Sequence, residues 1–344
     1  MRRVITFVLL GLGVFAVATG LLLQLYAYPR LAKVPHNIDT KSVAQGSGIT
    51  ALVYVPNGSS SSPEIRENLS LTSTTHVTGD LSQPEVDRDS DVTAWTEASI
   101  VKDDEDDLVV TAGLRGLCMD RHTGEAVVPC EGQFYEDNKG DRKRASRNQL
   151  LQPGLNFKFP FGAEQRTYKW FDTEIKQAVD ARFDGEEQVK GIDTNRYVIT
   201  IPPTKIDTRD VPGKLIGKPD VPTIKADLYY EVTRTLWVEP TTGAILAGRQ
   251  DGKQELREPS QAAGEGTYVF NGTLQLNDET VSKNSEEAKK NISKLFAITT
   301  LPIILWSAGG VIILIAVALL VFGGGDQRPA RRSPPRRQGV GAGV

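Results

Sequence analysis

The chain has 344 residues, of which 39% are hydrophobic, and its formal net charge is −3. That charge excludes the strongly basic character of a nucleic-acid-binding protein. Three histidines and two cysteines are too few for a metal site built from imidazole and thiolate ligands, so we expect neither a metal nor a cofactor.

An uncharged apolar run at residues 4–23 follows two arginines. A helix needs about 20 apolar residues to cross ~30 Å of hydrocarbon. Residues 1–28 are therefore predicted to form a short cytoplasmic start and a first transmembrane helix. A cleaved signal peptide is the alternative, since Ala16, Val17 and Ala18 resemble a small-residue cleavage site. Both alternatives export the residues that follow.

Residues 29–294 are interpreted as one extracytoplasmic domain that is mainly β. Strand-like stretches rich in β-branched residues recur, and units at 118–127, 170–179 and 236–246 read as strand, turn and strand. Gly124 and Gly243 can supply the positive φ that such a turn needs. The pattern predicts an antiparallel, hairpin-built, barrel-like domain. Residues 202–222, rich in Pro, Gly, Lys and Asp, are predicted to form a surface loop or a seam between subdomains.

Cys118 and Cys130 are the only cysteines, and eleven residues separate them. A hairpin would bring the two ends of this segment into bridging range, and disulfides persist in exported proteins. We predict a disulfide; two unrelated free thiols are the alternative.

Two further features have both a functional and a structural interpretation. Five acidic residues at 103–107 could bind calcium, but they lack the ligand spacing of an EF-hand, and a solvated acidic loop is favoured. Phe157, Phe159 and Phe161 alternate with other residues, so in an extended segment they would share one face. Such a stripe could line a lipid-accepting tunnel; the alternative, which we favour, is a place in the core.

The second apolar run predicts a transmembrane helix at residues 295–323, preceded by an amphipathic helix at 282–294. Residues 324–344 form an Arg- and Pro-rich tail that is predicted to be disordered. Arginines lie beside the ends of both spans that are nearer the chain termini, which favours cytoplasmic termini in a plasma membrane. Lys289, Lys290 and Lys294 lie on the opposite side, but large domains translocate largely regardless of charge.

The sequence contains no nucleophile elbow, phosphate-binding loop, dinucleotide fingerprint or zinc-protease motif, so no catalytic residue is predicted and we expect no enzyme. Two helices cannot enclose a channel, and the middle lacks the dyad segments of a membrane barrel.

Several segments together resemble the porin PorA family of actinobacterial two-span envelope proteins. They are the first span with its Tyr-Pro end, residues 118–127, residues 159–164 with 168–172, residues 234–243, and the closing span. The resemblance implies a β-rich exported domain on two membrane legs, similar in layout to scavenger receptor class B proteins. It further implies envelope lipids or glycolipids as ligands and a lipid exporter in the same membrane as a partner.

Two functions of different classes follow from these observations. The first is a non-enzymatic protein whose exported domain binds or transfers envelope lipids at the outer face of the plasma membrane. The second is a structural adaptor that docks a lipid transporter or a cell-wall enzyme. An apolar stripe can line a tunnel or fill a core, so the sequence does not distinguish between these two functions.

The cysteine pairing gives a direct test. A maleimide reagent should label neither cysteine in the unfolded, unreduced chain and both cysteines after reduction, as measured by intact mass. Labelling of both without reductant would contradict the disulfide.

Overall fold

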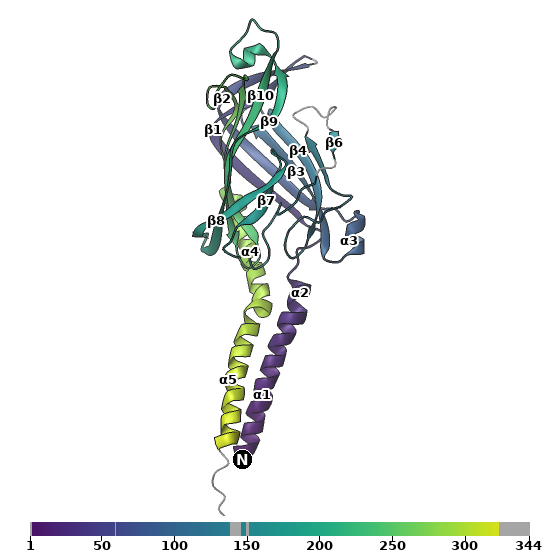
Figure 1. Ribbon diagram of the computed structural model, residues 1–344, viewed down its shortest axis with the longest axis vertical. Helices are drawn as coiled ribbons and strands as arrows, with labels where there is room; N and C mark the ends of the chain where they lie inside the picture. Colours follow the sequence, from purple (N-terminus) through teal and green to yellow (C-terminus); the bar gives the residue numbers. More distant parts are fainter. Residues whose placement is uncertain (1, 59, 138–145, 149–150, 323–344) are drawn as a thin grey trace, which may run out of the picture. The chain divides into compact units, whose positions relative to one another are not determined.

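The computed structural model describes residues 2–58, 60–137, 146–148 and 151–322. The chain divides into two compact units: Met1–Tyr28 together with Phe296–Val344, and Pro29–Leu295. The first unit holds the apolar helices, and the second holds the β-strands (Figure 1).

Helix α1 spans Arg2–Leu22 and continues through a π-helical turn at Leu23–Ala27 into α2, Tyr28–Leu31. Helix α5 spans Leu301–Phe322. Two continuous helical stretches, Arg3–Leu31 and Asp278–Phe322, are long and apolar enough to cross a membrane, and most of their apolar side chains are exposed. A soluble protein would bury such helices, so their exposure fits lipid contact.

Glycines let α1 and α5 approach closely. A Cβ built on Gly13 would lie 2.9 Å from the Gly309 carbonyl oxygen, and one on Gly20 would lie 3.1 Å from the Pro302 carbonyl oxygen. Contacts therefore run to lower residue numbers on α5 as they run to higher numbers on α1, so the two helices are antiparallel. Small residues at a membrane helix interface permit this backbone approach.

The β-domain is a single twelve-stranded sheet in the described residues, with the order β6-β5-β4-β3-β2-β1-β12-β11-β10-β9-β8-β7 and every strand pairing antiparallel. This confirms the predicted antiparallel, hairpin-built fold. The strands are β1 Asp39–Asn57, β2 Ser60–Gly79, β3 Val92–Asp103, β4 Val109–Asp120, β5 Phe134–Asp137, β6 Ser146–Asn148, β7 Tyr168–Asp172, β8 Gln177–Val189, β9 Ile192–Val211, β10 Ile224–Glu239, β11 Ala244–Arg257 and β12 Thr267–Leu276.

The sheet curls, so that β9 and β10 lie across from β3 and β4 (Figure 1). At the end where β1 begins and β12 ends, backbone hydrogen bonds close the curl. We call it the entry end because the chain enters the β-domain there; it is not an opening for a ligand. Ala126 N donates to Gly154 O at 3.0 Å, and Leu155 N donates to Lys169 O at 2.8 Å. The segment around Leu155 thus joins the turn after β4 to β7.

Away from the entry end the curl stays open. No described residue pairs with the outer edge of β4 at residues 109–112 or with the outer edge of β9 at residues 200–211. The two edges of the sheet therefore meet at the entry end and leave a lateral opening elsewhere.

Two short elements and one long helix complete the domain. Helix α3, Pro84–Arg88, lies between β2 and β3, and a 3-10 turn, Gly213–Ile216, follows β9. Helix α4, Asp278–Thr299, begins after β12 and packs Ala288 and Ile292 on Ile192 and Leu246 of the sheet. The apolar residues that α4 packs on the sheet recur at helical spacing, as the sequence predicted for residues 282–294.

The prediction of a loop at residues 202–222 is wrong for the first half of that range, because strand β9 continues to Val211. Residues Thr204–Val211 pair with β10, and the ladder shifts register between Thr204 and Ile201. Pro202 and Pro203 lie at this irregularity on an edge without a second partner. Proline is tolerated there because no ladder hydrogen bond needs its missing N–H.

The packing of α1 on α5 predicts different outcomes for neighbouring glycines. Gly13→Leu or Gly309→Leu should separate the helices, whereas Gly11→Leu and Gly310→Leu should not, since nothing lies within 4 Å of a Cβ at those positions. Spin labels at Val4→Cys and Val321→Cys, both exposed, would report a longer and broader distance distribution for the first two variants. An unchanged distance in Gly13→Leu would contradict the close pairing.

Candidate ligand-binding cavity

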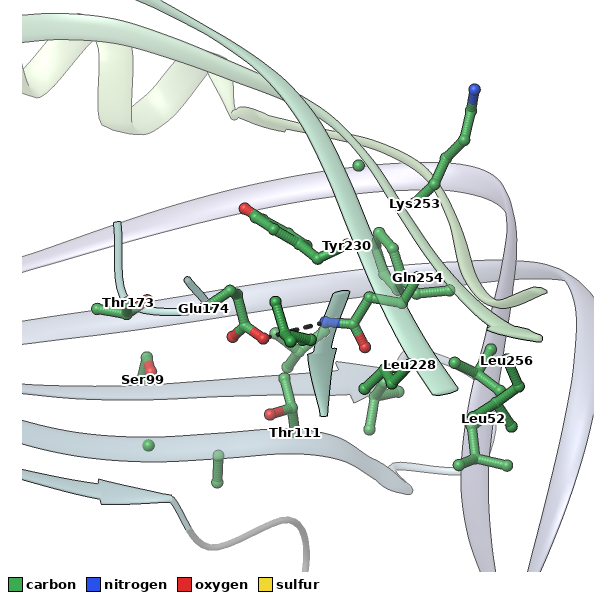
Figure 2. A pocket seen from close by; sticks show the side chains of 18 of the residues that line it. Leu52, Ser99, Thr111, Thr173, Glu174, Leu228, Tyr230, Lys253, Gln254 and Leu256 are labelled. Carbon is green, nitrogen blue, oxygen red and sulfur yellow. Dashed lines mark hydrogen bonds between the residues drawn. The ribbon is translucent and has the colours of Figure 1, made fainter. Parts of the chain in front are cut away.

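A cavity of about 400 Å³ lies inside the curled sheet (Figure 2). Residues of both unpaired edges line it, including Val110 on β4 and Asp210 on β9, so it communicates with the lateral opening. Its volume lies within the ~300–1,000 Å³ range of small-molecule sites.

The cavity has an apolar side, formed mainly by β1 and β9–β12. Leu228 and Leu256 are opposite each other in the β10–β11 register and are 4% and 3% exposed. Leu52, Ile206, Val211 and Val269 extend the same cluster. Figure 2 shows Leu52, Leu228 and Leu256 gathered at one end of the view, away from Ser99 and Thr173.

Polar groups gather on β3, β4 and the β7–β8 turn. Ser99, Thr111 and Thr173 contribute hydroxyls, and Glu174 reaches from the turn into the cavity (Figure 2). Its Oε2 accepts a hydrogen bond from Nε2 of Gln254 on β11 at 3.2 Å. The site is therefore amphipathic, with Leu52, Leu228 and Leu256 apart from the hydroxyls of Ser99 and Thr173 (Figure 2).

Arg115 and Glu97 form an ion pair at the edge of the cavity nearer the entry end. Arg115 Nε donates to Glu97 Oε1 at 2.9 Å, and its Nη2 donates to Oε2 at 3.0 Å. Its Nη1 donates to Asn156 Oδ1 at 2.8 Å and to Gln152 Oε1 at 3.3 Å. This planar, bidentate geometry is the strong form of an Arg–carboxylate pair.

A second charged network lies beside the cavity. Tyr230, which lines the cavity, donates its hydroxyl proton to Asp172 Oδ2 at 3.2 Å, and Arg234 Nη2 reaches the same oxygen at 3.3 Å. Burial raises the pKa of Tyr230, so its hydroxyl stays protonated as a donor. Asp172 is 1% exposed and is neutralised by Arg234.

An aromatic cluster fills the interior at the entry end. Phe159, with no exposed surface, stacks on Tyr197 with ring centroids 4.4 Å apart and on Trp170 at 5.6 Å. Burial raises the pKa of Tyr197 to about 12, and its hydroxyl donates to Glu164 O at 2.6 Å. Side chains therefore occupy the space through which a passage along the barrel axis would run.

The three phenylalanines proposed from sequence do not share one surface. Phe159 belongs to this aromatic cluster, whereas Phe157 and Phe161 pack against a separate cluster that contains Trp95 and Met119. Phe157 lies under the guanidinium of Arg115, with the Arg115 Cζ 4.8 Å from its ring centroid. In this conformation the three rings pack as core side chains, and none of them lines the cavity.

Lys158, between two of these rings, is 7% exposed, and its Nζ has no hydrogen-bond partner among the described residues. The Nζ lies 4.0 Å from the ring centroid of Phe161. Burial lowers the pKa of Lys158 to about 7, and the charge of Asp120 opposes that shift only in part.

Cys118 and Cys130 are at bonding distance, with their Cα atoms 6.0 Å apart, within the usual disulfide range. The described residues bring together one group of three potential metal ligands, Glu85 with these two cysteines, and the sulfurs are bonded to each other. In the acidic turn after β3, Asp106 pairs with Arg66 at 2.5 Å and Asp107 with Lys102 at 2.8 Å.

The cavity residues were not predicted from the sequence. The only signal in the sequence is that the polar residues Ser99, Arg115 and Gln254 interrupt the alternation of apolar and polar residues along their strands. Such interruptions also occur at solvent-facing positions, so they do not identify a cavity. What distinguishes them is the curl of the sheet, which brings β3 and β4 opposite β11.

This fold and this cavity define a membrane protein: an antiparallel β-domain with an internal amphipathic cavity, carried between two apolar helices that can span a bilayer. A family model described as Porin PorA matches residues 5–318, and the chain belongs to that family.

Two relatives are both named Porin PorA. The protein from Corynebacterium amycolatum is 29% identical over 127 residues, which cover 30% of this chain and 33% of the relative. The protein from Corynebacterium resistens is 24% identical over 222 residues, which cover 46% of this chain and 54% of the relative. The chain thus spans between a third and about half of the length of these curated relatives.

The burial of Lys158 predicts a pH-dependent stability. Its folded-state pKa of about 7 lies below the ordinary value of 10.5, so folding disfavours the ammonium form. The resulting destabilisation is complete below pH 7 and fades as the pH rises toward 10.5. Lys158→Met should therefore raise the free energy of unfolding most at pH 6 and little at pH 10.

Urea unfolding of the full chain, followed by tryptophan fluorescence, measures this difference. Lys41→Met, an exposed position on β1, is the control and should be nearly neutral at both pH values. An equal effect of Lys158→Met at both pH values would contradict the buried ammonium.

Proposed function

We propose that this protein binds an envelope lipid or glycolipid in the cavity of its β-domain, at the outer face of the plasma membrane, and catalyses no reaction. The observation that carries the proposal is the amphipathic cavity beside the lateral opening, with Leu228 and Leu256 on one side and Ser99, Thr111 and Glu174 on the other. Each CH₂ group of an acyl chain that is buried there would gain ~0.8 kcal/mol over exposure to water.

The proposed topology has two spans and both termini in the cytoplasm. The support for this topology is the antiparallel packing of α1 on α5. If both helices cross one membrane, this packing requires the start of α1 and the end of α5 to lie on the same side of it. Arg2 and Arg3 at one outer end and the arginines of residues 324–344 at the other favour the cytoplasm for that side. The β-domain then lies outside.

The outward face of the sheet also supports an extramembrane domain. It carries ion pairs such as Lys205 with Asp227 at 2.8 Å, Arg196 with Glu187 at 3.0 Å and Arg249 with Asp251 at 2.8 Å. A basic residue on the lipid face of a membrane barrel costs ~2–4 kcal/mol at the bilayer midplane. This sheet is therefore suited to water and not to a bilayer.

The filled entry end favours holding a lipid over conducting it. The ring stack of Phe159, Tyr197 and Trp170 lies between the cavity and the entry end, and the Arg115–Glu97 pair lines the cavity on that side. A lipid would enter and leave through the lateral opening between β4 and β9. The pore that the relatives' name suggests would need a continuous passage, which this packing does not favour.

Photo-crosslinking of the full chain in lipid bilayers tests the proposal. A monoacylglycerol with a diazirine in its acyl chain, which has an uncharged head, should label the apolar helices in every sample, which provides an internal positive control. In the wild type it should also label peptides of β10 and β11 that contain Leu228 and Leu256. Labelling confined to the helices would refute lipid binding in the cavity, and a single co-purified membrane protein would then favour the adaptor function.

Two glycines of β11 give a matched pair of variants. Gly252 lines the cavity, whereas Gly248, four residues away on the same face, does not. A Cβ at either position would meet its nearest atom at an ordinary distance, 3.4 Å for Gly252 and 3.6 Å for Gly248. Gly252→Val should reduce labelling of β10 and β11 severalfold, and Gly248→Val should leave it near the wild-type level. Equal labelling of the two variants would contradict a bound chain in the cavity.

A further inference from the structure

We propose that the head of the bound ligand is uncharged and that the cavity discriminates against amphiphiles with a phosphate or carboxylate head. This inference rests on the proposed function, because it presupposes that an amphiphile occupies the cavity. It concerns which member of that ligand class the side chains accept.

Every cation in the described lining already has a carboxylate partner. The cations are Arg115, Arg209 and Lys253. Arg115 pairs with Glu97 at 2.9 Å, Arg209 with Asp207 at 2.6 Å and Lys253 with Glu231 at 3.7 Å. Figure 2 shows the Lys253 amino group directed away from Gln254 and Tyr230. An anionic head would therefore find its possible counter-ions already neutralised.

Arg115 is the cation best placed to meet a head group, since it lines the cavity and its side chain is 9% exposed. A guanidinium has five N–H donors. Four of them are directed at Glu97, Gln152 and Asn156. Phe157 covers one face of its plane. Bidentate binding of a phosphate at Arg115 would require these bonds to break.

The acidic groups of the lining add to the discrimination. Glu97, Glu174 and Asp210 balance the three cations in number. The carboxylate of Glu174 lies among the polar lining residues and is bonded to the neutral amide of Gln254 (Figure 2). A phosphate placed beside Glu174 would meet a like charge in a partly buried site, which is costly.

Neutral donors and acceptors remain for the head. The hydroxyls of Ser99, Thr111 and Thr173 can each donate and accept, and they line the cavity around Glu174. An ester or a hydroxyl-bearing head can satisfy these groups without bringing a charge. The polar side of the cavity is therefore complementary to a neutral, hydroxylated head.

Competition against the diazirine lipid tests this inference on the full chain in bilayers. The competitors are 1-monooleoylglycerol and 1-oleoyl lysophosphatidic acid, which share one acyl chain and differ by a phosphate. We expect the neutral competitor to suppress labelling of β10 and β11 at a concentration about tenfold lower, which corresponds to ~1.4 kcal/mol. Equal or stronger competition by the phosphate would overturn the inference while leaving lipid binding intact. No labelling of β10 and β11 at all would instead refute the proposed function.

A charge variant should abolish the preference. Glu97→Gln keeps the shape of the side chain but leaves Arg115 without its carboxylate, so we expect the phosphate competitor to gain about tenfold relative to the neutral one. Glu67→Gln, an exposed position on β2 with the same change in net charge, should keep the wild-type ratio. Near-ultraviolet circular dichroism verifies that both variants fold. A folded Glu97→Gln variant with the wild-type ratio would contradict the role assigned to the Arg115–Glu97 pair.

Discussion

The pairing of β1 with β12 is the constraint on which the rest of this structure depends. It joins the first long strand of the chain to the last, with Ala44 opposite Leu276. Because the pair is antiparallel, the start of β1 and the end of β12 lie at one end of the sheet. Asn277 N donates to Val43 O at 2.9 Å, and Thr280 of α4 bonds to the backbone of Val43, which fixes this junction. The segments that lead to the two apolar helices therefore leave the domain from neighbouring strands.

With its first and last strands joined, the meander has its free edges in the middle of the chain, at β6 and β7. The connection between those edges passes the entry end, where Leu155 bonds to β7 on one side and Glu125 bridges it on the other. The curled sheet is thus closed at the entry end, where the segment between β6 and β7 runs, and open elsewhere. Because residues of both unpaired edges line the cavity, this incomplete closure gives the cavity its lateral opening.

Local patterns were sufficient to predict most of the fold. The β-branched alternation around Thr50, Trp95 and Val232, the Thr-Gly turns at Gly124 and Gly243, and the apolar stripe of α4 each depend on neighbouring residues, and each element is present in the structure. The extension of β9 beyond Pro203 was not predictable, because its only support is pairing with β10 across a long connection. Local composition alone indicated a loop there.

The candidate site depends on distant residues, and for that reason the sequence did not reveal it. Glu174 and Gln254 are 80 residues apart, and Arg115 and Asn156 are 41 apart. The phenylalanine alternation at 157–161 indicated a shared face only if the segment was a strand. It is not one, and its rings enter two different clusters.

The unpaired edge of β9 has a further consequence, for self-association. An exposed strand edge invites a strand of another molecule to add by hydrogen bonding, which leads to aggregation. In β9 this edge begins with Pro202 and Pro203, which have no N–H to offer, and continues with the charged Lys205, Asp207 and Arg209. The prolines and charges therefore disfavour the addition of another molecule's strand at the edge where the interior of the domain is accessible.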